Sequence, residues 1–146
     1  MSQFTNVLAL YLLEDREGRP VLRDGRCQWQ LSREIKYDVG TEFSGETITI
    51  PTSFVTDLAS IPFPARGLLP PDGPWAKAAV LHDALYASQG TCVFSGYSYR
   101  SREAPYTREE SDKILREAMG VLGVPTGKQA LIYRAVRAFG GRGWGS

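Results

Sequence analysis

The first half of the chain has the short alternating apolar segments of an antiparallel sheet. In GETITIP, Ile48 and Ile50 alternate with Thr47 and Thr49, which places the two isoleucines on one face of a strand. CQWQLSREIKYDVG alternates over part of its length, and the Asp-Gly pair in RPVLRDG marks a turn. The apolar run NVLALYLL is compatible with a strand, although periodicity alone does not exclude a helix. We therefore predict an antiparallel β-meander over residues 4–56.

The second half has the periodicity of amphipathic helices, with apolar residues every three or four positions. The pattern predicts helices over residues 75–88, 107–122 and 126–139. The polar, Tyr- and Ser-rich residues 89–106 form either a hairpin or a mobile flap. The end of the chain, residues 141–146, is expected to be flexible or ordered only against a partner. The predicted fold class is α+β, with an N-terminal antiparallel β-meander followed by a three-helix C-terminal half in a single domain, residues 1–146.

Local signals define the helix starts and the connection between the halves. Thr107 and Glu110 have the spacing of a capping box, in which side chains satisfy two amides at a helix start. Thr126 and Gln129 predict a similar box for the last helix. Residues 57–74 include five prolines, which fix φ and remove backbone donors. This segment is therefore predicted to be a rigid, irregular connector rather than a continuation of the sheet, and residues 75–140 are predicted to be mainly helical.

The composition is typical of a globular protein and bears on which kinds of partner the chain can bind. Hydrophobic residues make up 42%, charged residues 23%, and the net charge is +1. The balance of charge gives no indication of nucleic-acid binding. The start of the chain lacks the pattern of a secretory signal, and its apolar run is too short to span a bilayer, so we expect no transmembrane segment. Cys27 and Cys92 can form one disulfide, but two free thiols in a reducing compartment are the simpler expectation.

The first predicted helix carries the only histidine of the chain, in the segment AVLHDALYAS. His82 and Tyr86 share one helix face, and Asp83 borders that face. A buried imidazole needs hydrogen-bond partners, and Asp112 on the next helix lies at the edge of an apolar stripe, where it is costly unless paired. If these helices pack antiparallel, Asp112 reaches the ring of His82, and Tyr86 can bond to the same carboxylate.

These residues resemble the site of secreted phospholipases. HDALY matches the helical His-Asp-x-x-Tyr of that family, and SDKILREAM is similar to the later helix that supplies an aspartate behind the histidine. The resemblance implies that His82 is a general base for water, that Asp112 orients it, that Tyr86 supports the pair and that Asp83 holds calcium. It covers about a fifth of the sequence. The glycine-rich calcium loop and the dense disulfide scaffold of that family are absent from the sequence.

A second resemblance covers more of the chain, from about residue 49 to 140. Four segments, in the order PTSFVTDLASIPFPARGLLPP, KAAVLHDALY, SDKILREAM and IYRAVRAFG, are similar to a domain-of-unknown-function family of tailed bacteriophages and prophages. This resemblance implies a phage origin and no established chemistry. Other phage structural proteins are the partners it implies.

Other candidate sites use carboxylates and a serine. With one histidine and no cysteine cluster, a zinc site is not expected, but an all-oxygen Ca²⁺ or Mg²⁺ site is open to Asp83 and Asp57. Ser60 is a candidate nucleophile with His82 and Asp112. It lacks the glycine context of a nucleophile elbow, so a turn-capping role for Ser60 is the simpler interpretation.

Two classes of function follow from these patterns. The first is a virion component of the tail or baseplate, made in the host cytoplasm, in which the polar residues only lock the fold. The second is a hydrolase of envelope lipid or peptidoglycan, metal-assisted or metal-free, in which a dyad of His82 and Asp112 activates water. We favour the first because the calcium loop is missing and no reactive nucleophile stands out.

Overall fold

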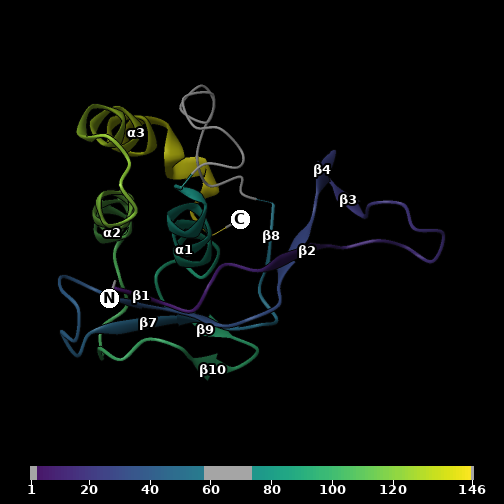
Figure 1. The fold of residues 1–146 in the computed structure, drawn as a ribbon, viewed down its shortest axis with the longest axis horizontal. Helices are drawn as coiled ribbons and strands as arrows, with labels where there is room; N and C mark the ends of the chain where they lie inside the picture. Colours follow the sequence, from purple (N-terminus) through teal and green to yellow (C-terminus); the bar gives the residue numbers. More distant parts are fainter. Residues whose placement is uncertain (1–2, 58–73, 146) are drawn as a thin grey trace.

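Helices from the second half of the chain lie over strands from the first half (Figure 1). The computed structural model describes residues 3–57 and 74–145. All strand pairs in these residues are antiparallel, and the predicted α+β class is confirmed. Residues 58–73, most of the predicted proline-rich connector, lie outside the described residues.

The strands beneath the helices form two small sheets. One has the order β1-β6-β7, from β1 (Phe4–Thr5), β6 (Ile35–Asp38) and β7 (Thr47–Ile50). The other has the order β2-β5-β8, from β2 (Leu10–Leu12), β5 (Trp29–Leu31) and β8 (Val55–Thr56). Tyr37 pairs with Ile48 and both are buried, while Lys36 and its partner Thr49 face outward, as the alternation predicted. The pairing order is not that of a simple meander, because strands that are distant in sequence lie side by side.

Residues 14–26, which we call the arm, interrupt the second sheet between β2 and β5. Every residue of the arm is exposed, and the loop over residues 14–21 projects away from the helices (Figure 1). Its chain runs through β3 (Leu22–Arg23), and β4 (Arg26–Cys27) begins at its last residue. The turn between them places Asp24 and Gly25 at φ values of 52° and 75°. Positive φ at both positions is what a type I′ hairpin turn requires, so the predicted Asp-Gly turn is confirmed.

The helices of the described part are α1 (Ala76–Ala87), α2 (Arg108–Val121) and α3 (Thr126–Phe139), followed by a short 3-10 helix, η2 (Gly140–Gly143). Helix α1 packs against α2 and also contacts β8, so it is buried on most of its surface. The capping box at the start of α2 is confirmed, since the amides of Glu110 and Thr107 each bond to the other residue's side chain. The box predicted for α3 is wrong: Gln129 donates instead to the carbonyl of Val124 at 2.8 Å.

Three smaller predictions have clear outcomes. Residues 89–106 contain a hairpin of β9 (Val93–Phe94) and β10 (Tyr97–Ser98), which confirms the hairpin alternative. Cys27 and Cys92 are free thiols, as expected. The prediction of a flexible end is wrong as far as residue 145, because the Trp144 ring packs edge-on against Tyr86 and the Gly145 amide donates to the Tyr86 carbonyl.

Within the described residues, none of the helices is long and apolar enough to cross a bilayer.

Candidate functional site

Helices α1 and α2 bring a histidine, a tyrosine and an aspartate into one buried network. His82 Nε2 lies 2.8 Å from Asp112 Oδ1, and the Tyr86 hydroxyl donates to the same oxygen at 2.6 Å. His82 and Asp112 are 0% exposed and Tyr86 is 1% exposed. The contacts predicted from the spacing of these residues are therefore confirmed, while the catalytic roles implied by the phospholipase resemblance stay predictions.

Two arginines that the sequence analysis did not identify complete the network. Arg137, near the end of α3, donates to Asp112 Oδ2 at 2.7 Å. Arg108, at the start of α2, donates through Nε to the Tyr86 hydroxyl at 3.1 Å and through Nη2 to the carbonyls of Val136 and Arg137. A buried carboxylate needs a hydrogen-bond partner for each of its two oxygens. This rule was the one indication in the sequence that Asp112 would bind a cation as well as His82.

The network holds Asp112 in its ionised form. Burial raises the pKa of this carboxyl, but hydrogen bonds from His82, Tyr86 and Arg137 outweigh burial and bring the pKa below its ordinary value of 3.8. An ionised carboxylate only accepts hydrogen bonds, so His82 Nε2 is the ring nitrogen that carries a hydrogen toward Asp112. Burial, reinforced by the bond to Asp112, raises the pKa of the Tyr86 phenol well above its usual range, which keeps Tyr86 a donor.

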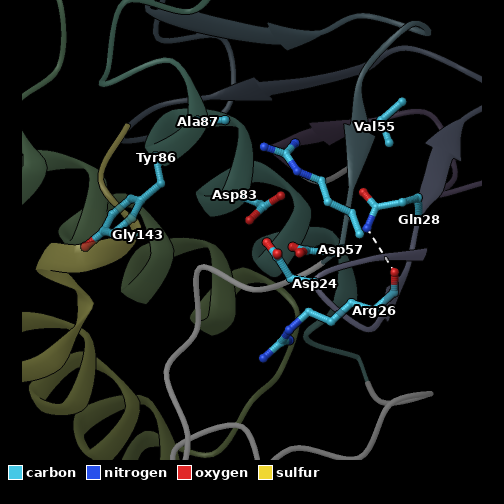
Figure 2. Close-up of a pocket in the computed structure, with 10 residues that line it drawn as sticks. Asp24, Arg26, Gln28, Val55, Asp57, Asp83, Tyr86, Ala87 and Gly143 are labelled. Atoms are coloured by element: carbon cyan, nitrogen blue, oxygen red, sulfur yellow. Dashed lines mark hydrogen bonds between the residues drawn. The ribbon is translucent and has the colours of Figure 1, made fainter. Parts of the chain in front are cut away.

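A cavity of about 270 Å³ lies beside this network. Its lining includes Tyr86 and Gly143 on one side and Gln28 and Val55 on the other (Figure 2). His82 is not among the lining residues, and its side chain is fully buried. Tyr86 is therefore the member of the network that reaches the cavity wall.

The predicted metal ligands Asp83 and Asp57 both line this cavity. Asp24 joins them from the turn of the arm, and the three carboxylates point toward the same region (Figure 2). From the sequence, Asp24 could be recognised only as a turn residue, and nothing in the sequence indicated its place in the cavity. The hydroxyl of Thr56 donates to Asp83 Oδ2. Ser60, the candidate nucleophile, lies outside the described residues.

A divalent metal ion at this cavity would need several oxygen ligands close together. Calcium takes six to eight oxygen ligands within about 2.6 Å, and magnesium requires a tighter octahedron. In residues 3–57 and 74–145, no three His, Cys, Asp or Glu side chains are grouped closely enough to hold an ion. The metal-binding role that the sequence suggested for Asp83 and Asp57 therefore stays a prediction.

Comparison with known proteins gives one match. The family model described as "Protein of unknown function (DUF1353)" matches residues 29–136. Neither a curated protein nor a solved structure matches the chain. The matched region includes Asp57, His82, Asp83 and Asp112, whereas the arm precedes it.

Replacing Asp112 by asparagine tests the charge in this network. The Asp112→Asn variant leaves His82 and Arg137 without an anion, so we expect its free energy of unfolding at neutral pH to fall by about 3 kcal/mol. Because the pKa of Asp112 is lower in the folded than in the unfolded chain, the wild-type advantage is complete well above pH 3.8 and is lost as the pH falls through the folded value. Urea denaturation of both proteins across this pH range measures the difference.

Glu109→Gln is the matched control, because Glu109 lies on the same helix with its side chain 57% exposed in a pair with Lys113. Its effect should be small. A deficit of Asp112→Asn that stays constant into acid would contradict an ionised Asp112 in the folded chain.

Proposed function

We propose that this chain, which belongs to the DUF1353 family, is a phage-encoded component of the virion, in the tail or baseplate, with no catalytic role for its histidine. The observation that carries the non-enzymatic part is the enclosure of the His82–Asp112 pair. A general base must come within hydrogen-bond reach of the water it activates. The His82 ring is 0% exposed, and both oxygens of Asp112 are bonded inside the protein.

The phage origin rests on the four segments that resemble the tailed-phage and prophage family. The arm supports an assembly role. It is exposed along its whole length and carries apolar side chains in water, with Val21 40% and Leu22 60% exposed. A neighbouring phage structural protein that packs on the arm would cover these side chains, as interfaces between subunits commonly do.

The test of the virion role uses particles of the phage or prophage that encodes the chain. We expect mass spectrometry of particles purified through a density gradient and a high-salt wash to find the chain at a constant ratio to the tail proteins. Particles produced without the gene should show a tail or baseplate defect. The chain occurring only in the soluble fraction of the host cytoplasm, with normal particles in its absence, would contradict this function.

One observation favours a second candidate, a metal-free hydrolase of envelope lipid or peptidoglycan. Tyr86 both donates to Asp112 and lines the cavity, so the dyad lies one side chain away from a space that a small group can enter. In this function His82 would activate water, Asp112 would orient the ring, and Tyr86 would support Asp112.

Replacing His82 separates the two candidates. For a virion component, wild type hydrolyses neither labelled phospholipid nor peptidoglycan, and His82→Ala lowers the free energy of unfolding by roughly 1–3 kcal/mol, because it leaves Asp112 short of a donor. For a hydrolase, wild type is active and His82→Ala reduces the rate by about a hundredfold to ten-thousandfold. Thermal melting and the hydrolysis assays, run on the same preparations, decide which is correct. Activity in wild type that disappears in a folded His82→Ala variant would refute the non-enzymatic role.

A further inference from the structure

The last α-helix has one side turned toward solvent. Helix α3 packs on α2, on the side of α2 away from the sheets (Figure 1). The buried residues of α3, Ile132 and Val136, are four positions apart and so lie on one face. Lys128, Leu131 and Arg134 follow one another at intervals of three residues on the other side of the helix, and all three are exposed.

The exposed side of α3 carries positive charge that the described residues do not neutralise. Helix α3 and the residues after it contain four basic residues and no Asp or Glu. Arg137 is held by the buried Asp112. Lys128, Arg134 and Arg142 make no ion pair with a carboxylate in the described part of the chain. Three cations therefore remain available to a partner with negative charge.

Apolar side chains are exposed among these cations. Leu131 is 52% exposed and Phe139 is 66% exposed. They are eight positions apart, with the half-buried Ala135 midway between them, so they belong to one stripe along the helix. Single exposed apolar residues are common on protein surfaces and need no explanation. An apolar stripe bordered by Lys and Arg is more specific, because it is typical of helices that lie on a membrane surface.

The chemistry of this surface separates two anionic partners. A nucleic acid offers phosphates to the cations but no apolar layer for Leu131, and proteins that bind it are usually strongly basic, whereas the net charge here is +1. An anionic bilayer offers phosphate groups to the cations and acyl chains to the apolar side chains. We propose that α3 and η2 bind reversibly to anionic phospholipid membranes through a basic face, made of Lys128, Leu131, Arg134, Phe139 and Arg142.

Sedimentation with lipid vesicles tests this binding on the full chain, without any virion protein. The vesicles contain either equal parts of phosphatidylglycerol and phosphatidylcholine, or phosphatidylcholine alone. We expect affinity for the anionic vesicles to be higher by about tenfold or more, because each Lys or Arg near an anionic surface adds to binding. Affinity should also fall as salt is added, since salt screens exposed charges. Equal binding to both kinds of vesicle, or no binding to either, overturns the proposal.

The triple variant Lys128→Gln, Arg134→Gln, Arg142→Gln tests the cations of the basic face. All three residues are exposed and make no ion pair with the described carboxylates, so the melting temperature should be unchanged. Affinity for the anionic vesicles should fall by about tenfold or more. An affinity equal to that of wild type would refute the assignment to this face.

The matched control is the triple variant Arg16→Gln, Arg23→Gln, Arg33→Gln. It removes the same charge from exposed residues of the arm and of the loop after β5, which also make no ion pair with a described carboxylate. Its affinity for anionic vesicles should stay close to that of wild type. An equal loss in both triple variants would show that net charge alone governs binding, and would also refute the assignment.

The double variant Leu131→Ser, Phe139→Ser keeps every charge and tests the apolar stripe. We expect it to bind anionic vesicles more weakly than wild type, because its side chains no longer enter the acyl layer. A labelled single-stranded oligonucleotide serves as the competing anionic partner. Unchanged vesicle affinity in the double variant, or tighter binding of wild type to the oligonucleotide than to the vesicles, would contradict a membrane-binding face.

Discussion

The Asp112 carboxylate is the interaction on which the helical half depends. One oxygen accepts from His82 and Tyr86 of α1, and the other accepts from Arg137 of α3. A buried carboxylate costs several kcal/mol in desolvation, and that cost is offset only when each oxygen is bonded with good geometry. Because α2 carries the carboxylate and both neighbouring helices supply donors, one charged group links α1, α2 and α3, in addition to the apolar side chains packed between them.

The same network organises the surface next to it. Tyr86 receives a hydrogen bond from Arg108, and the Trp144 ring packs edge-on against it, 5.1 Å between ring centroids. Tyr86 also borders the cavity, together with Arg23, Asp24 and Arg26 of the arm. The buried network therefore lies directly beside a cavity that is lined largely by charged and polar side chains. A sequence pattern that resembles a hydrolytic dyad is therefore compatible with a histidine whose side chain is fully buried.

Sequence reasoning succeeded where local rules decide the structure. The apolar period of α2 and its capping box gave the helix start, and the cost of an unpaired Asp112 correctly predicted its contact with His82. It failed where distant parts of the chain meet. The pairing of β2 with β5 across the arm, the bond from Arg137, and the packing of Trp144 on Tyr86 have no local signature. The sequence indicated that Asp24 is a turn residue. Its position near Asp57 and Asp83 depends on the tertiary placement of the arm, which the local sequence does not determine.

The central claim is that His82 is a fixed donor to a buried, ionised Asp112. Because the chain has one histidine, long-range ¹H–¹⁵N NMR of the imidazole reports this residue alone. The predicted result is a protonated Nε2 whose hydrogen exchanges slowly with water, so that its signal is visible directly and is lost or strongly shifted in Asp112→Asn. A ring with its hydrogen on Nδ1 only, or an Nε2 hydrogen that exchanges too fast to observe, would contradict the account.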